Sequence, residues 1–438
     1  MTKSRLKKPA FFLEAGMKII VIGGVAAGMS AAARLRRLSE DAEIIVIEKG
    51  GYVSFANCGL PYYIGGKITD REKLILQTPE SFKSRFNVDV RTKTEAVSID
   101  PAKKEVKVKD LLTGREYYEK YDKMILAPGA EPVRPPISGI DSRGLFTLRS
   151  MEDTDRIYSF IKEIKPGKAV VIGGGYIGVE TAENLKQRGL QVTIVEAMRR
   201  IMPLMDEEIT AVIQNHLMEK NVELVLADGV NSFTSDGKNT TVKLKSGREI
   251  NAGLVIISVG VRPDTKLAVS AGIKTGSRGI LVNEYMQTSN PDIYACGDAV
   301  EVINPLTGIN ASIALAGPAN KQGRIAADNI IEGNKVKYRG TMGTAALKIF
   351  DLTVAATGLN EAQLKAMKID YESVLIHSGN HAGYYPGAAV LTLKLLFAKN
   401  DGRIMGVQAI GSDGVDKRVD VASAFLSKQG TVYDLAAF

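Results

Sequence analysis

A glycine-rich turn follows the first apolar stretch of the chain, in KIIVIGGVAAG at residues 18–28. A helical pattern covers residues 29–38, and a second apolar run at 43–47 ends at Glu48. Strand, glycine turn, helix, strand and acid in this order are typical of a dinucleotide-binding βαβ unit. We expect the helix N-terminus to receive a pyrophosphate and Glu48 to bind the hydroxyls of an adenosine ribose.

The glycines of this turn have distinct physical tasks. Gly23 permits the tight turn, together with its neighbour Gly24, and Gly28 allows the helix and the strand to pack closely. The motif departs from the usual pattern at one point, because Val25 occupies the central glycine position.

The same pattern occurs a second time in AVVIGGGYIG at residues 169–178. A helix is predicted to about residue 188, followed by a strand at 192–195 and by Glu196. All three glycines of the fingerprint are present, at Gly173, Gly175 and Gly178. Glu196 would repel a 2′-phosphate and therefore favours NADH, although Arg199 and Arg200 nearby keep NADPH as an alternative.

Two dinucleotide folds in one chain indicate two cofactors that exchange electrons. The stretch TSNPDIYACGD at 288–298 ends a predicted strand with a glycine–aspartate pair. Asp298 and the adjacent Gly297 are placed to bind the ribityl or pyrophosphate part of FAD. We therefore expect FAD on the first fold and NADH on the second, and we interpret Cys296 as a small packing residue.

Composition excludes several classes of protein. The 438 residues carry a formal net charge of +8 without a concentrated basic face, so nucleic-acid binding is not expected. No apolar run reaches membrane-spanning length. Two distant cysteines argue against a disulfide scaffold and for a reducing, cytoplasmic setting. The three histidines do not pair with the cysteines at metal-ligand spacing, so no metal site is predicted.

The predicted fold class is α/β, with two Rossmann-like dinucleotide-binding domains and an α+β C-terminal domain. Strands in the last part, such as 388–397 and 404–410, form that third domain. The expected division is an N-terminal extension at 1–16, a first FAD-binding part at 17–130, an NAD(P)H-binding domain at 131–262, a second FAD-binding part at 263–340 and a dimerisation domain at 341–438.

A cysteine follows the first unit in SFANCGLPYYIGG at residues 54–66. Pro61 suits the first turn of a helix, where its missing N–H costs little. A cysteine at such a helix start faces the positive end of the dipole, which favours thiolate. We interpret Cys58 as a redox nucleophile; the alternative is a small buried core cysteine.

Together these motifs resemble the flavin- and pyridine-nucleotide-dependent disulfide reductase superfamily of glutathione reductase-like fold. The single cysteine in SFANC resembles the coenzyme A-disulfide reductase branch, which includes NADH-dependent persulfide reductases and adjoins the NADH oxidases and peroxidases. The glutathione-reductase branch carries a second cysteine four residues away, and Cys58 has none. Oxidase- and peroxidase-type relatives carry a histidine at the position of Ala26 that stabilises a cysteine sulfenic acid.

The resemblance also implies site residues. The motif HAGYYPG at 381–387 resembles a family motif whose tyrosine reaches the partner subunit's active site and assists the leaving thiol. Tyr384 is the candidate, which implies a homodimer built through the last domain. The implied contacts to coenzyme A, as substrate or bound thiol, are Ser30, Arg34, Arg37, Ser54, Asn57, Asn320 and Lys321.

The resemblance implies that electrons pass from NADH through FAD to coenzyme A disulfide, coenzyme A persulfide or polysulfide, with Cys58 forming a mixed disulfide. Two alternatives stay open: an NADH oxidase that cycles Cys58 through sulfenic acid, and an NADH-dependent reductase of a small electron carrier. Family chains usually continue past residues 433–435 to a second active-site tyrosine, and persulfide reductases often add a rhodanese domain. We therefore expect a shortened C-terminal end.

Overall fold

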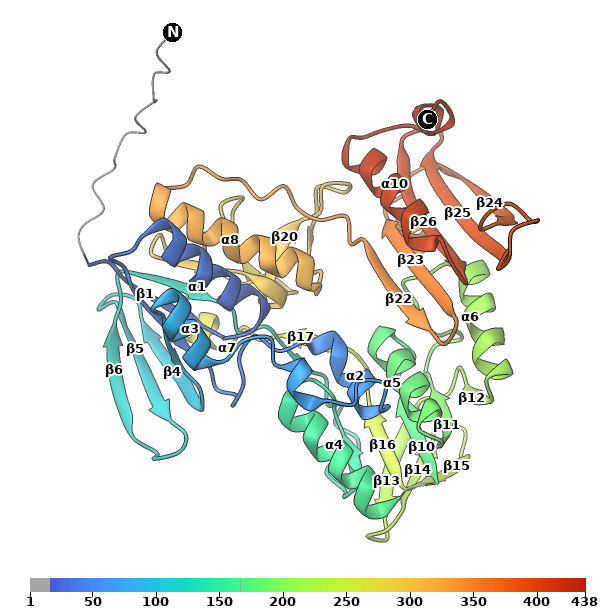
Figure 1. The fold of residues 1–438 in the computed structure, drawn as a ribbon, viewed down its shortest axis with the longest axis horizontal. Coiled ribbons are helices and arrows are strands. Elements are labelled where there is room, and N and C mark those ends of the chain that lie inside the picture. The colour runs from blue at the N-terminus through green and yellow to red at the C-terminus, as the bar shows by residue number, and fades with distance from the viewer. Residues whose placement is uncertain (1–15, 166) are drawn as a thin grey trace.

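Three bodies of sheet and helix make up the protein (Figure 1). The computed structural model describes residues 16–165 and 167–438, so the expected N-terminal extension lies outside the described residues except for Gly16. The predicted fold class agrees with the structure, which contains two parallel five-stranded sheets and one antiparallel five-stranded sheet.

The first parallel sheet is built from the strands of the first βαβ unit and from later segments. Its order is β19-β7-β1-β2-β3. Ile19, Ile20 and Val21 of its central strand are fully buried. Its members are β1 (Lys18–Ile22), β2 (Glu43–Ile47), β3 (Asp89–Arg91), β7 (Lys123–Leu126) and β19 (Ile293–Ala295).

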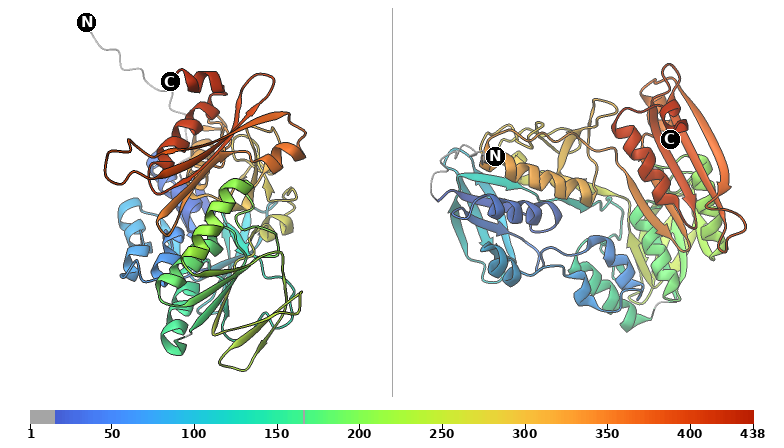
Figure 2. Two further views of the ribbon diagram at one scale, coloured as in Figure 1. Left: turned by 90° about the vertical axis from the view of Figure 1, so that its right-hand side faces the viewer. Right: turned by 45° about the horizontal axis from the view of Figure 1, so that its top comes forward.

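Two long helices lie side by side on this body, α1 (Ala26–Leu38) and α8 (Ala316–Glu332), as both views show (Figures 1 and 2). A Cβ on Gly323 of α8 would lie 2.2 Å from the Ala27 carbonyl oxygen, so only glycine permits this close packing. The helix α1 begins three residues before the expected position, because its backbone turns into helix directly after Val25.

The second parallel sheet has the same arrangement as the first around its central strand, but its edge strand β9 comes first in the chain, whereas β19 comes last in the first sheet. Its order is β12-β11-β10-β16-β9, with the glycine-turn strand β10 again at the centre. Its helices are α4 (Met151–Ile164), α5 (Tyr176–Gln187) and α6 (Glu207–Glu219). Its strands are β9 (Leu145–Phe146), β10 (Lys168–Ile172), β11 (Gln191–Val195), β12 (Val222–Val225) and β16 (Leu254–Ile257).

Each parallel sheet is accompanied by an antiparallel three-stranded sheet. The first is β4 (Thr94–Asp100), β5 (Glu105–Asp110) and β6 (Glu116–Lys120), and the second is β13 (Val230–Ser235), β14 (Thr240–Leu244) and β15 (Glu249–Ala252). The strands β8 (Ala130–Pro132) and β17 (Val261–Pro263) pair where the chain leaves the first body and returns to it. The crossovers therefore lie beside each other.

The third body is an antiparallel sheet of order β22-β23-β26-β25-β24 with α10 (Val415–Ser427) packed on β23 and β26. Its strands are β22 (Ala345–Ile349), β23 (Leu352–Gly358), β24 (Tyr371–Gly379), β25 (Val390–Ala398) and β26 (Ile404–Gly411). The edge strand β24 exposes Val374, Leu375 and Ile376. An apolar edge of this kind favours association with another chain.

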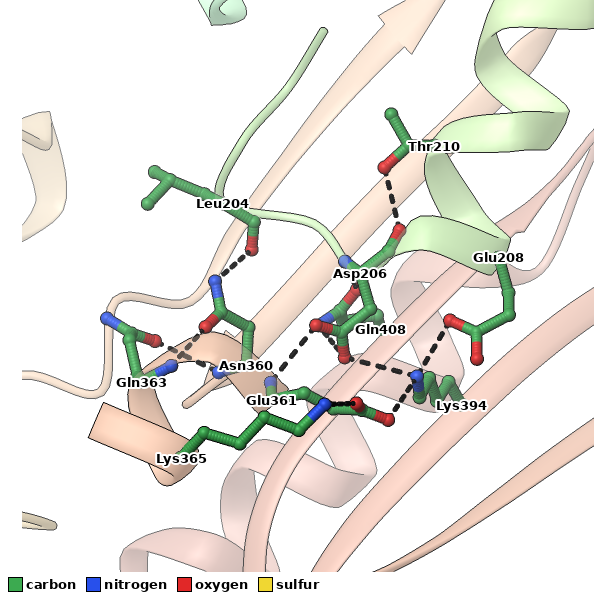
Figure 3. Close-up of polar contacts among 10 residues, drawn as sticks. All are labelled: Leu204, Asp206, Glu208, Thr210, Asn360, Glu361, Gln363, Lys365, Lys394 and Gln408. Atoms are coloured by element: carbon green, nitrogen blue, oxygen red, sulfur yellow. Dashed lines mark hydrogen bonds and ion pairs between the residues drawn. The ribbon is translucent and has the colours of Figure 1, made fainter. Parts of the chain in front are cut away.

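A buried lysine joins the third body to the second (Figure 3). Lys394 of β25 is 1% exposed, and its Nζ lies 2.7 Å from Oε2 of Glu208 and 2.7 Å from Oε1 of Glu361, at the start of α9 (Glu361–Ala366). Asp206, just before α6, completes the cluster at 3.5 Å from Nζ and accepts a hydrogen bond from Gln408. The ion cluster therefore fixes the two domains to each other.

Several short elements complete the fold. No helix in the described parts of the chain is both long and apolar enough to cross a bilayer. The remaining α-helices and strands of the described residues are α2 (Leu60–Ile64), α3 (Pro79–Phe86), α7 (Lys266–Ser270), α11 (Val432–Ala436), β18 (Ile280–Leu281), β20 (Val300–Ile303) and β21 (Asn310–Ala311).

Candidate active site

The first glycine turn lies at the carboxyl end of β1. Gly23 has a φ of 102°, and a Cβ there would lie 2.1 Å from the Ala127 carbonyl oxygen. A Cβ on Gly28 would lie 1.9 Å from the Gly23 carbonyl oxygen. Among the described residues, no side chain caps the start of α1 and no acid lies in its first turn. Its free N–H groups therefore suit the pyrophosphate of FAD.

Glu48 ties this turn to the end of β2. Its Oε2 accepts a hydrogen bond from the Gly24 N–H at 2.7 Å, and its Oε1 accepts one from the Gly50 N–H at 2.6 Å. The carboxylate is thereby held beside the turn, where an adenosine ribose would lie.

The second glycine turn has the same geometry. Gly173 has a φ of 103°, and a Cβ on Gly178 would lie 2.1 Å from the Gly173 carbonyl oxygen. Glu196 accepts the Gly174 N–H at 2.8 Å and the Met198 N–H at 2.9 Å. A Cβ on Gly175 would meet no atom of the described chain within 4 Å, so this turn has room for a nucleotide.

Asp298 lies in a short helical turn, Gly297–Ala299, directly after β19. The Gly297 N–H donates to Gln322 of α8 at 2.8 Å. Asp298 lines a cavity of about 280 Å³ together with Ala130 and residues of β17. Burial raises the pKa of its carboxyl group, and Arg149 partly offsets the effect. The aspartate therefore faces a cavity, and the short turn that carries it packs against α1, where a Cβ on Gly297 would lie 3.1 Å from the Ala27 Cβ.

Cys58 lies in a single helical turn, Asn57–Gly59, that continues into α2. Pro61 occupies the first turn of α2, as predicted. Ser54 has a φ of 46° and donates its N–H to the Gly24 carbonyl oxygen at 2.9 Å, which holds the segment against the first glycine turn. Cys58 is exposed, whereas Cys296 is fully buried. Only one of the two thiols is therefore accessible.

The electrostatics of Cys58 differ from the expectation. Desolvation raises the pKa of its thiol above the ordinary value, the charge of Glu180 raises it further, and a backbone hydrogen bond opposes both. The pKa of the thiol is therefore raised, whereas the position at a helix start predicts a lowered one. A proton must therefore leave Cys58 before it can attack sulfur.

The structure brings some predicted coenzyme A contacts together. Ser30 of α1 donates a hydrogen bond from Oγ to Asn320 Oδ1 of α8 at 2.8 Å. Lys321 and Arg37 are exposed on the same pair of helices. Arg34 instead forms an ion pair with Asp328, with 2.6 Å between Nε and Oδ1. Asn57 is exposed beside Cys58. The serine–asparagine pair thus marks the junction of α1 and α8.

Tyr384 lies in the loop between β24 and β25 and is 92% exposed. The neighbouring Tyr385 packs edge-on against His381 with 5.6 Å between ring centroids. This loop belongs to the third body, whereas Cys58 directly precedes α2, whose Leu60, Tyr63 and Ile64 pack into the core of the second body.

Two residues near Cys58 were missed by sequence reasoning. Tyr62 of α2 donates a hydrogen bond to Glu180 Oε1 of α5 at 3.3 Å. Desolvation first, and then Glu183, raise the pKa of Glu180 to about 7, while the bond from Tyr62 opposes them. Glu180 follows the second glycine turn, and this position is the only feature of the sequence that could have indicated it as a site residue. Its proximity to the cysteine arises from domain packing.

Comparison with known proteins agrees with this geometry. The family model "Pyridine nucleotide-disulphide oxidoreductase" matches residues 17–323, and the model of its dimerisation domain matches residues 344–438. A coenzyme A disulfide reductase of Staphylococcus haemolyticus is 36% identical over 96% of this chain and 94% of its own length.

Two solved structures are closely similar. The reduced Bacillus anthracis CoADR-RHD is 50% identical with a TM-score of 0.95, over 97% of this chain and 76% of that chain. An NAD-dependent persulfide reductase from A. fulgidus is 40% identical with a TM-score of 0.93, over 96% and 79%. The family implies FAD and NAD(P)H, and both glycine turns fit such cofactors. This chain belongs to the pyridine nucleotide-disulphide oxidoreductase family and is a flavin-dependent oxidoreductase of pyridine nucleotides.

Proposed function

We propose that the protein uses NADH to reduce coenzyme A disulfide or a coenzyme A persulfide through Cys58. The observation that carries this proposal is the accessibility of a single thiol: Cys58 is exposed and Cys296 is fully buried. Because no second accessible cysteine is present among the described residues, the other sulfur of the redox cycle must come from the substrate. The names of the similar proteins support coenzyme A or a persulfide as its source.

Each of the two glycine turns would bind one of the two cofactors. Gly23, Gly24, Gly28, Glu48 and the pair Gly297–Asp298 would hold FAD. Gly173, Gly175, Gly178 and Glu196 would hold NADH. FAD, when bound, transfers the two electrons that NADH supplies to the sulfur site. The FAD-binding parts would span 17–130 and 263–340, with the NADH-binding domain at 131–262 between them.

The nucleophile of the proposed reaction is the thiolate of Cys58. The Cys58 thiolate attacks one sulfur of the coenzyme A disulfide, the substrate S–S bond breaks, and a coenzyme A thiolate leaves. The product is a mixed disulfide between Cys58 and coenzyme A. Two electrons then cleave it, and each departing coenzyme A thiolate takes up one proton.

Coenzyme A would extend from Cys58 toward the junction of α1 and α8. The Ser30–Asn320 hydrogen bond lies at this junction, and Arg37 and Lys321 are exposed cations on the same two helices. Positive charge there suits the phosphates of coenzyme A. Ser54 and Asn57 would position the thiol end. Arg34 would first have to exchange its ion pair with Asp328.

The active unit would be a cytoplasmic homodimer. The dimerisation-domain match and the exposed apolar strand β24 support the dimer. Tyr384, 92% exposed on the same domain, would reach the partner's Cys58 site and protonate the leaving thiol.

The test is anaerobic NADH consumption by the flavin-loaded protein with coenzyme A disulfide, coenzyme A persulfide or oxidised glutathione. We expect turnover with coenzyme A species alone, its loss in Cys58→Ser, and a reduced rate in Tyr384→Phe. Cys296→Ser is the matched control and should retain the rate. Reduction of the flavin without transfer to any of these acceptors would contradict the proposal, and subsequent addition of oxygen would identify an oxidase.

A further inference from the structure

The segment that carries Cys58 is fixed along its length to the nucleotide-binding helix α5. Tyr62 donates to Glu180 at 3.3 Å, and Arg188 Nη1 donates to the Ile64 carbonyl oxygen at 2.7 Å. A Cβ on Gly65 would lie 2.5 Å from Asn184 Oδ1, so the two helices meet at close range. Leu60, Tyr63 and Ile64 of α2 share one buried core with α5.

Tyr62 links the cysteine to this contact. It follows Cys58 by four residues, across a helical turn that runs directly into α2. Residues spaced in this way are neighbours on a helical surface. The charge of Cys58 contributes to the raised pKa of Tyr62, after burial and the charges of Glu180 and Glu183. Tyr62 therefore interacts with both acids.

The charged groups around this contact come from three elements. Glu183 lies one turn further along α5 and raises the pKa of Glu180. Lys67, just after α2, lies 5.7 Å from the Tyr62 ring centroid. Lys67 and Lys348 of β22 both lower the pKa of Glu183. Both cations thus act on Glu183, and Glu180 is the carboxyl group that Tyr62 contacts directly.

We propose that Glu180, held by Tyr62, is a positioning residue that sets the proton affinity of Cys58, so that the NADH-binding helix also controls the sulfur nucleophile. A charged Glu180 keeps the proton on Cys58. A protonated Glu180 removes this repulsion, and the thiolate forms more readily. The inference rests on the proposed function in taking Cys58 as the reacting thiol.

The test measures the rate at which iodoacetamide alkylates Cys58 in the flavin-loaded protein across a pH series, by mass spectrometry of the Cys58 peptide. Glu180→Gln should raise the rate at neutral pH roughly threefold or more, because thiolate is the reactive form. It should also convert a profile spread over two coupled titrations into a single step. Glu180→Asp should restore the two-step profile. Glu219→Gln, a change of an exposed acid on α6, is the control.

Tyr62→Phe is the second variant, because it leaves the Glu180 carboxylate in place but frees it to turn toward solvent. We expect a smaller rise in alkylation rate than in Glu180→Gln. Rates and profiles like those of the unmodified protein in both variants, with normal flavin content, would overturn the inference. If Cys58→Ser abolishes disulfide turnover in that case, the proposed function stands without it. If Glu180→Gln alters alkylation while Cys58→Ser retains turnover, the proposed function fails instead.

Discussion

The two dinucleotide-binding folds share their local design and differ in their surroundings. Both have a five-stranded parallel sheet of equivalent order, a glycine turn with positive φ, and a glutamate that accepts two backbone N–H groups. The first helix, α1, packs along α8, whereas α5 contacts α2 and, in the third body, β22. Equal local units therefore acquire different roles from their neighbours.

The two glycine turns also differ in the residue at their central position. Val25 fills that position in the first fold, whereas Gly175 leaves open space in the second. An enclosed helix suits a cofactor that stays bound, and an open turn suits a nucleotide that must enter and leave in each cycle. This comparison leads to four predictions.

The largest expected effect comes from the glycine that packs each helix on its strand. Gly28→Ala would place a Cβ 1.9 Å from a backbone oxygen, so the turn must deform. We expect the purified variant to lose its flavin absorbance. Gly178→Ala, with a clash at 2.1 Å, should retain flavin but lose flavin reduction by NADH. Equal loss of flavin in both variants would contradict the assignment of cofactors to folds.

The attachment of the third domain to the second fold gives the next effect. Lys394→Met would leave three carboxylates without their buried cation, and we expect a loss of about 3–5 kcal/mol in the free energy of unfolding. The exposed Lys399, paired with Glu372 at 3.2 Å, is the matched control. Lys399→Met should change stability by about 1 kcal/mol or less in a urea titration. Similar losses in the two variants would disprove the special role of Lys394.

The same cluster should respond to acid. Hydrogen bonds to Lys365 and Lys394 outweigh desolvation and lower the pKa of Glu361 from 4.5 to about 2. Its contribution to stability is thus full above about pH 4.5 and is lost as the pH falls toward 2. Asp206 shifts in the opposite direction, because burial outweighs Lys394. Urea titrations at pH 7, 4 and 3 should show a steeper acid loss in the unmodified protein than in Lys394→Met.

The smallest expected effect separates the two glutamates. Glu196→Gln removes the charge that holds the Gly174 and Met198 N–H groups and that would meet the ribose of NADH. We expect the KM for NADH to rise about tenfold, a change of about 1.4 kcal/mol, with flavin retained. Glu48→Gln should instead weaken flavin retention. A change in the KM for NADH of the same size in Glu48→Gln would remove the distinction between the folds.

Much of the fold could be predicted because its signals are local. The strands expected at 43–47 and 192–195 occur at 43–47 and 191–195, since short apolar runs beside glycine turns specify buried parallel strands. The strand expected before the Gly297–Asp298 pair also occurs, as β19. The edge strand β9 of the second sheet could not be predicted in this way, because two residues are too few for a periodic pattern and tertiary pairing alone defines it.

In the candidate site, too, some residues could be predicted from the sequence and others could not. The glycines, Glu48, Glu196 and Cys58 stand in motifs that can be read along the chain. Tyr62 and Glu180 are 118 residues apart and meet only because α2 packs on α5. The pKa of Cys58 shifts opposite to the expectation for the same reason, because a local helix-start argument omits desolvation and the charge of Glu180.

The sequence by itself determined that this protein has two dinucleotide turns, an acid after each, and one cysteine beside the first. These features depend on residue types at short spacing, where sterics and backbone hydrogen bonding act locally. The tertiary structure alone decided that Cys58 is accessible, that Glu180 raises the pKa of this thiol, and how Lys394 joins the third domain to the second. Burial and Coulomb interactions depend on distance in space, and residues far apart in sequence supply them.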